Sequence, residues 1–345
     1  IYLTPASGSW SSSWGPRPLG TEQVVIDLGT PALRVRPGVS LTAKQWRRSH
    51  LGSLTASAIV KHGSVVAEAG TSATPNIALA DPPARRLDLQ VDHGEFIRQL
   101  VSTPPSGATA KMYLDFTLLA GPAVDDTLGR SQIVLRLGGA VQEAQNPSTS
   151  AIGYGDPYPT DWARGYELRY GAYYPCTAQD SGSGCGGTVY VRGPLSELAS
   201  GTVRPRLSRP QALAIDGKDA MTVGDAVGQS PTVHWQAPAS GEVSTYMLSL
   251  IHLVPPVNGS LSEESVGLFI TPKNEVTVLP GILQPGERYY FKLRALGGLD
   301  TDAAVAPVRA SLRQPPAEAT VWSKPFTVTA ATRSRYCEIH VSERP

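Results

Sequence analysis

The chain has 345 residues, of which 41% are hydrophobic and 17% charged, and this apolar content excludes a mainly disordered protein. Its 30 basic and 29 acidic residues leave a formal charge of +1, which excludes recruitment of nucleic acid or an anionic membrane by charge alone. The length predicts two domains, and the 34 glycines and 30 prolines favour short strands joined by turns over long helices. We therefore expect an all-β protein with two β-sandwich domains.

The sequence also predicts where the protein works. It contains no stretch of about 20 apolar residues, so we expect no transmembrane segment. Because the chain begins with Ile1 rather than Met, we expect a processed, exported protein that is extracellular or at the cell surface, with the periplasm as an alternative. Arginine far outnumbers lysine, which is typical of a GC-rich, bacterial genome.

Residues 1–20 are predicted to form an extended arm. They are rich in serine and glycine, have no hydrophobic period, and contain Trp10 and Trp14. Burying an indole ring is worth about 2–3 kcal/mol, so we expect these rings to pack against a surface. Two alternatives remain: the arm packs on its own domain, or it docks on a neighbouring subunit, in which case Trp10 and Trp14 are binding residues.

Residues 21–204 are predicted to form the first domain, a jelly-roll-like or immunoglobulin-like sandwich. Its hydrophobic residues mostly alternate, as in the run 112–118, and this period of two is typical of half-buried antiparallel strands. One stretch after Asp92 has helical spacing, with Phe96 and Leu100 on one face and Asp92 as a candidate cap. We recognise no family in this domain.

The chain has three cysteines, and whether they form a disulfide depends on the compartment in which the protein works. Cys176 and Cys185 bracket a short polar loop that can fold back and bring the two sulfurs together, so we expect a disulfide between them, with two free thiols as the alternative. No further cysteine or histidine lies nearby to complete a zinc site. Cys337 is left over, either as an unpaired thiol or as a link to a partner.

Seven aromatic residues lie between positions 154 and 174, although aromatics make up only 7% of the chain. Of the four from Tyr166 onward, Tyr166, Tyr170 and Tyr174 share a predicted strand face with Leu168 and are expected in the core. The other three lie among glycine, proline and aspartate and are placed on a loop: Tyr154, Tyr158 and Trp162. Rings on a loop either anchor it or stack on a sugar or a partner chain, so these three are candidate binding residues.

Residues 205–331 are predicted to form the second domain, after a linker rich in arginine and proline, and a tail follows at 332–345. One predicted strand has Trp235 at its centre, and the next begins beside Tyr246. Further along, a turn is followed by alternating inward residues at fixed spacing: Leu283, Pro285, Gly286, Tyr289, Phe291, Leu293 and Ala295. This pattern resembles a fibronectin type III domain around the corner between its strands E and F.

The fibronectin resemblance implies particular roles for these residues. Trp235 would be a core residue, and Tyr289 would return its hydroxyl to the backbone in a tyrosine corner. Pro285 and Gly286 would turn the chain. The family mostly presents loops and sheet edges to partners, so the resemblance implies a spacer or interaction role.

The sequence offers no catalytic constellation. The motifs of a serine hydrolase, a phosphate-binding loop and a zinc protease are absent, and the six histidines are scattered. We therefore expect no cofactor, no metal and no catalytic residue, and a non-enzymatic, adhesin-like or structural subunit that binds other protein subunits or assembles with itself. The alternative is a polysaccharide-binding or polysaccharide-degrading accessory protein with its sugar site in the first domain, because paired carboxylates can meet in space without a sequence motif.

Overall fold

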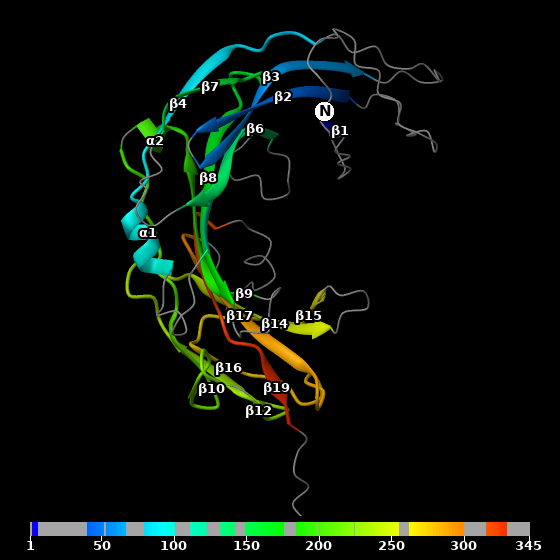
Figure 1. Ribbon diagram of the computed structural model, residues 1–345, viewed down its shortest axis with the longest axis vertical. Helices are drawn as coiled ribbons and strands as arrows, with labels where there is room; N and C mark the ends of the chain where they lie inside the picture. Colours follow the sequence, from blue (N-terminus) through cyan, green and yellow to red (C-terminus); the bar gives the residue numbers. More distant parts are fainter. Residues whose placement is uncertain are drawn as a thin grey trace, which may run out of the picture. The chain divides into compact units, whose positions relative to one another are not determined.

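The computed structural model describes residues 2–5, 40–51, 53–66, 79–100, 111–122, 132–141, 149–175, 184–199, 201–223, 225–254, 262–299 and 315–329 of the chain. These residues form strands β1 to β19 and two short helices, α1 and α2, so the predicted all-β class is confirmed (Figure 1). They divide between two compact units, which we call the amino-terminal unit and the carboxy-terminal unit.

The two units are made of alternating segments of the chain. Described residues within Ile1–Arg98, Lys111–Tyr170 and Tyr190–Arg204 belong to the amino-terminal unit, and those within Gln99–Ala110, Gly171–Val189 and Pro205–Pro345 belong to the carboxy-terminal unit. The division after residue 204 lies where the sequence predicts a domain boundary. The described residues within 171–189 fall in the carboxy-terminal unit, whereas the sequence analysis places them in the first domain.

The amino-terminal unit contains one large sheet with strand order β1-β2-β3-β6-β5-β8-β9, and strands β4 and β7 pair separately. The pairs between β1 and β2, β2 and β3, β3 and β6, and β5 and β6 are antiparallel. The elements are β1 (Tyr2–Pro5), β2 (Ser40–Leu51), β3 (Leu54–Val66), β4 (Ala84–Leu89), α1 (His93–Leu100), β5 (Lys111–Gly121), β6 (Gln132–Val141), β7 (Thr149–Gly155), β8 (Ala163–Pro175), β9 (Gly184–Pro194) and α2 (Ser196–Ala199). Helix α1 and strands β8 and β9 contribute residues to both units.

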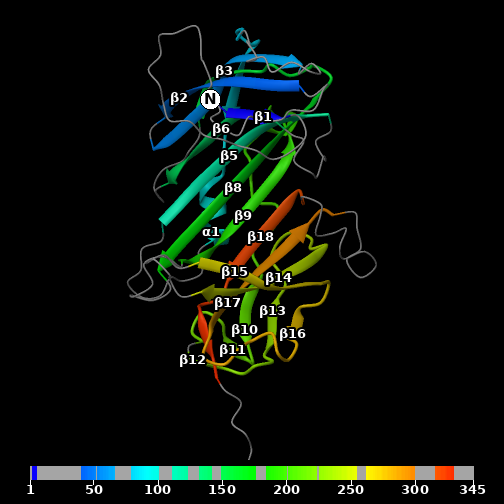
Figure 2. The ribbon, with the colours of Figure 1, turned by 90° about the vertical axis from the view of Figure 1, so that its right-hand side faces the viewer.

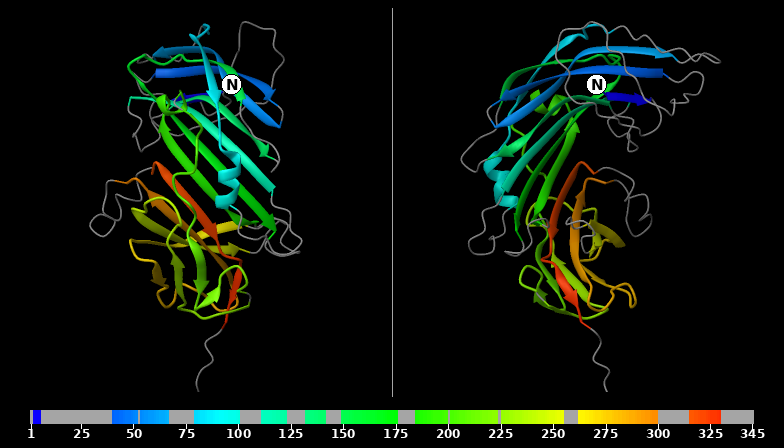
Figure 3. Two further views of the ribbon diagram at one scale, coloured as in Figure 1. Left: turned by 90° about the vertical axis from the view of Figure 1, so that its left-hand side faces the viewer. Right: turned by 45° about the vertical axis from the view of Figure 1, so that its right-hand side comes forward.

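The core of this unit lies on one face of its sheet. Side chains of β5 alternate between buried and half-exposed, as its period of two predicts. The ring of Phe116 on β5 stacks on Tyr166 of β8, and Tyr170 further along β8 stacks on Phe96 of α1 at 4.5 Å between ring centroids. Helix α1 and the β4–β7 pair lie on this face (Figure 3), and the opposite face, seen in Figure 2, has no described helix or strand of the unit over it.

Helix α1 confirms the helical spacing that follows Asp92. The Asp92 Oδ1 atom accepts a hydrogen bond of 3.1 Å from the Glu95 backbone N–H, which satisfies one donor of the first turn as an N-cap should. Phe96, Ile97 and Leu100 are buried, and the Phe96 ring meets the sheet at Tyr170. The predicted face of the helix is therefore the observed one.

The carboxy-terminal unit is a sandwich of two sheets. Strands β11-β10-β13-β16 form one sheet, and the other has the order β9-β18-β17-β14-β15, with β19 paired to β17 and β12 paired to β19. The elements are β10 (Gln211–Ile215), β11 (Lys218–Asp219), β12 (Asp225–Val227), β13 (Thr232–Gln236), β14 (Thr245–Val254), β15 (Ser262–Thr271), β16 (Glu275–Thr277), β17 (Arg288–Gly297), β18 (Ala317–Trp322) and β19 (Phe326–Val328).

Aromatic side chains join the two sheets of this sandwich. Trp235 on β13 packs edge-on against Tyr246 on β14, with 5.2 Å between ring centroids, and Trp235 is 3% exposed. Within one sheet, Phe291 on β17 stacks on Phe326 of the neighbouring β19 at 5.3 Å, so both rings add to the core between the layers. The residues that the sequence places in the core of this unit are thus buried between its layers.

The turn before β17 has the geometry that the sequence pattern predicts. Gly286 has a φ of +84°, a left-handed conformation that glycine adopts without strain. Beyond the turn, the Tyr289 hydroxyl accepts a hydrogen bond of 3.2 Å from the backbone N–H of Gln284. The predicted hydrogen bond between the tyrosine hydroxyl and the preceding backbone is therefore present, with the backbone N–H as the donor.

Several predicted features fall outside the described residues. Trp10, Trp14, Cys176 and Cys337 are among them, and the side chain of Cys185 on β9 is not described either, so the disulfide stays a prediction. Within the described ranges, neither helix has the length and apolar character needed to cross a membrane.

Candidate functional site

The loop between β7 and β8 carries two of the three aromatic residues expected there. Tyr158 and Trp162 stack face to face, with 5.4 Å between ring centroids and 5° between ring planes. A turn brings them together, in which the Trp162 backbone N–H donates to the Pro159 carbonyl at 3.2 Å. Both residues are half-buried, so the pair is partly accessible to a ligand.

An arginine at the start of β8 holds this loop in shape. The Arg164 guanidinium donates to both carboxylate oxygens of Asp156, at 2.8 and 3.1 Å, and to the carbonyls of Tyr158, Pro159 and Trp162. The Asp156 carboxylate also accepts from the Tyr158 backbone N–H. Because the Asp156 side chain is 7% exposed and that of Arg164 16%, this is a buried, bidentate ion pair whose donors are mostly used. The rings are therefore presented by a rigid loop.

A buried lysine completes the cluster. Lys44 on β2 is 5% exposed, its Nζ donates to the Gln132 Oε1 atom on β6 at 2.8 Å, and it lies 5.3 Å from the centroid of the Tyr158 ring. That distance allows a cation–π interaction. Burial lowers the pKa of Lys44 to about 8. Burial also raises the pKa of Tyr158, with a further contribution from the charge of Asp156, while Arg164 acts in the opposite direction.

The third aromatic residue does not belong to this site. The glycine and proline neighbours of Tyr154 predict a loop position, but Tyr154 lies in β7 and is 8% exposed. A buried ring offers no face to a sugar, so a three-ring stacking platform is not formed. Tyr158 is covered by Trp162 on one side, and both residues of the pair are half-buried.

The pH dependence of stability tests the burial of Lys44. We expect the free energy of unfolding to rise by roughly 2 kcal/mol as the pH increases from about 8 toward 10.5. In the unfolded chain Lys44 has the ordinary pKa of 10.5, so between these pH values the unfolded state binds more protons and a higher pH favours the folded state. Urea unfolding of the protein and of Lys44→Met across this range measures the effect. If the free energies of unfolding of the two proteins differed by the same amount at every pH, the expected effect of Lys44 would be contradicted.

Comparison with known proteins assigns no family to the chain. No family model matches it, and no curated protein matches it. The fibronectin type III resemblance of residues 205–331 therefore stays a prediction. Among the described residues, no three histidine, cysteine, aspartate or glutamate side chains come together in a group that could hold a metal ion.

Proposed function

We propose that the chain is a non-enzymatic, exported structural protein, a subunit of a cell-surface or extracellular assembly, and that its copies join through strand β15. The observation that carries this proposal is the edge that β15 presents. It is the last strand in its sheet, paired on one side to β14, with no described strand on its other side. Unpaired backbone groups along such an edge are a template for another strand.

The side chains of β15 do little to block that pairing. Proteins usually protect edge strands with charge, proline or a cover. Here the second half of the strand is apolar, from Val266 to Ile270, and Leu268 within it is 52% exposed. An exposed leucine on an open edge is stabilised by a partner that covers it.

The charges along β15 favour a second copy of the chain as that partner. The strand begins with Glu263 and Glu264, and Lys273 follows its end. In an antiparallel pair of β15 strands, the acidic start of one strand lies near the basic end of the other, whereas a parallel pair places like charges side by side. A symmetric, antiparallel dimer contact is therefore favoured.

Two further features are compatible with assembly by strand addition. In the amino-terminal unit, β1 adds to the edge of β2 with Tyr2 opposite Lys44, and residues 6–39 separate the two strands in the chain. Strand addition is thus already used at one sheet edge of the protein. The fibronectin resemblance also supports an interaction role, since that family presents edges to partners.

Replacing Leu268 tests the contact. We expect the native chain to form at least dimers and Leu268→Lys to raise their dissociation constant at least about tenfold, because the edge then carries a charge that must be desolvated. Light scattering coupled to size-exclusion chromatography measures the mass at several concentrations. Leu279→Lys is the matched control, because Leu279 is 63% exposed but lies outside β15.

Other results would contradict assembly through β15. A native chain that is monomeric, or equal effects of Leu268→Lys and Leu279→Lys, would exclude it. If a monomeric chain bound polysaccharide and lost that binding on Trp162→Ala, the alternative function of a carbohydrate-binding protein would be favoured instead. That outcome would point to the half-buried Trp162 as the stacking residue.

A further inference from the structure

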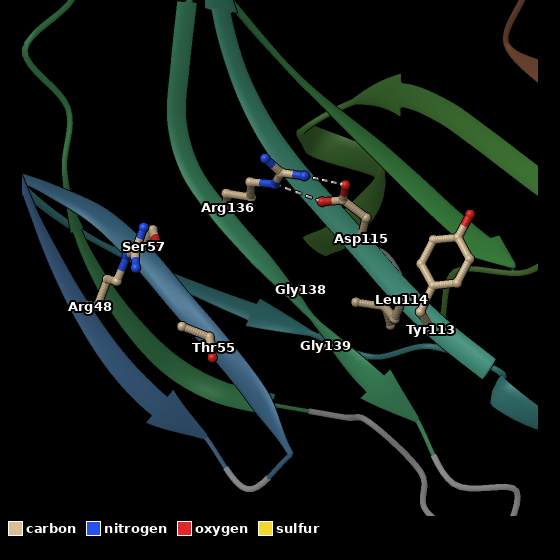
Figure 4. A pocket seen from close by; sticks show the side chains of 9 residues that line it. All are labelled: Arg48, Thr55, Ser57, Tyr113, Leu114, Asp115, Arg136, Gly138 and Gly139. Atoms are coloured by element: carbon tan, nitrogen blue, oxygen red, sulfur yellow. Dashed lines mark hydrogen bonds and ion pairs between the residues drawn. The ribbon is translucent and has the colours of Figure 1, made fainter. Parts of the chain in front are cut away.

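A polar hollow of about 370 Å³ lies on the sheet of the amino-terminal unit (Figure 4). Strands β2, β3, β5 and β6 contribute its lining. The hollow is on the face opposite α1, because its polar residues alternate along the strands with the buried residues of the core. Its most polar lining side chains are Arg48, Thr55, Ser57, Tyr113, Asp115 and Arg136.

A glycine forms the floor of the hollow. Gly138 on β6 is paired with Thr55 on β3 and with Asp115 on β5. Because glycine has no side chain, the space between the Thr55 and Asp115 side chains is left open. A Cβ atom at this position would lie 3.7 Å from the Leu114 carbonyl and 3.9 Å from the Asp115 carboxylate, which are ordinary contacts. Packing of the protein thus does not demand a glycine here, and the missing side chain leaves room for a ligand.

The charged side chains around the hollow differ in whether they already have a hydrogen-bond or ion-pair partner. Arg136 donates to Asp115 through two hydrogen bonds, of 3.0 and 2.7 Å, which Figure 4 shows as dashed lines. Arg48, on β2 opposite Ser57, has no hydrogen-bond or ion-pair partner among the described residues. At the rim, Tyr113 has the guanidinium of Arg169 over its ring at 5.5 Å. The lining therefore carries a net positive charge of one, from two arginines and one aspartate.

We infer that this hollow binds a uronic acid residue of an acidic polysaccharide. Arg48 pairs with the sugar carboxylate, since a guanidinium matches the two oxygens of a carboxylate. The hydroxyls of Thr55 and Ser57 and the carboxylate of Asp115 bond to sugar hydroxyls, which both donate and accept. A phosphate dianion suits the hollow less well, because Asp115 repels it while the net charge is only +1.

Binding of a short oligogalacturonate to the full chain tests this inference, with calorimetry as the measurement. We expect Arg48→Gln to weaken binding about tenfold, the usual effect of losing a charge-assisted hydrogen bond. Arg47→Gln is the matched control, because Arg47 is the exposed neighbour of Arg48 on β2 and pairs with Ala58, so it faces the other side of the sheet. We expect it to change the affinity by less than about twofold.

Two more measurements separate binding in the hollow from general attraction to charge. Gly138→Val fills the hollow without a charge change, and we expect it to abolish binding while the melting temperature is kept. A neutral galactose oligomer should bind at least about tenfold more weakly than the oligogalacturonate. If Gly138→Val does not fold, the comparison of Arg48→Gln with Arg47→Gln decides alone.

Three outcomes would overturn the inference. They are no binding of oligogalacturonate by the full chain, equal binding of acidic and neutral oligomers, and equal losses in Arg48→Gln and Arg47→Gln. The inference would also be overturned if inorganic phosphate displaced the oligogalacturonate at a lower concentration than acetate does. That result would identify the hollow as a phosphate site. The inference does not rest on assembly through β15, and a monomeric protein would leave it standing.

Discussion

Trp235→Ala will lower the free energy of unfolding of the carboxy-terminal unit by about 3–5 kcal/mol. The indole of Trp235 is 3% exposed between the two sheets and packs edge-on against Tyr246. Truncation removes the buried apolar surface of the indole and leaves a cavity between the sheets. Strands β13 and β14 cannot move together to close this cavity, because each is paired to neighbours in its own sheet. Chemical denaturation followed by tyrosine and tryptophan fluorescence measures the loss.

The neighbouring residue provides the control for this substitution. His234 precedes Trp235 on β13 but is exposed, so His234→Ala should change stability by no more than about 0.5 kcal/mol. The loss of stability in Trp235→Phe should lie between those of Trp235→Ala and His234→Ala, since a smaller ring keeps part of the contact with Tyr246. A loss below about 1 kcal/mol for Trp235→Ala would mean that this ring does not hold the sheets together.

Much of the carboxy-terminal unit could be predicted because its signals are local. Alternation along a strand places side chains on one face whatever the strand order, and the fibronectin resemblance, which rests on spacing along single strands and one turn, implies that Trp235 and Phe291 are core residues, as they are. The turn at Gly286 and the hydrogen bond to Tyr289 involve residues only a few positions apart. The same is true of the Asp92 cap of α1.

The candidate site contains residues that no such signal could identify. Lys44 and Gln132 are 88 positions apart, and they meet under Tyr158 only because β2, β6 and the β7–β8 loop come together in the unit. Strand order is decided by long-range pairing, about which the period of a single strand says nothing. A lysine within an alternating run is most simply expected to face water, yet Lys44 is buried.

The misplacement of Tyr154 has a different physical cause. Gly155 follows it, and a glycine before prolines is typical of a loop. In the structure Gly155 is the last residue of β7, and a Cβ atom there would lie 2.7 Å from the Ile59 carbonyl. This glycine therefore permits close packing of a strand rather than a turn, and sequence alone does not distinguish the two uses.

Arg164→Ala is expected to destabilise the amino-terminal unit by about 3–5 kcal/mol. The substitution leaves the carboxylate of Asp156, which is 7% exposed, without the cation that faces both its oxygens. It also leaves the carbonyls of Tyr158, Pro159 and Trp162 without their shared donor, so the stacked rings lose their support. Thermal and urea unfolding measure the loss of stability.

Arg136→Ala is the matched control, because Arg136 makes the same bidentate contact with Asp115 at an exposed position. Its side chain is 58% exposed and that of Asp115 26%, so water replaces the lost bonds and the cost should stay below about 1 kcal/mol. The double variant Arg164→Ala/Asp156→Asn should be more stable than Arg164→Ala alone, since it removes the stranded charge. Equal stability of the single and double variants would show that the carbonyl contacts, and not the buried charge of Asp156, dominate the effect of Arg164.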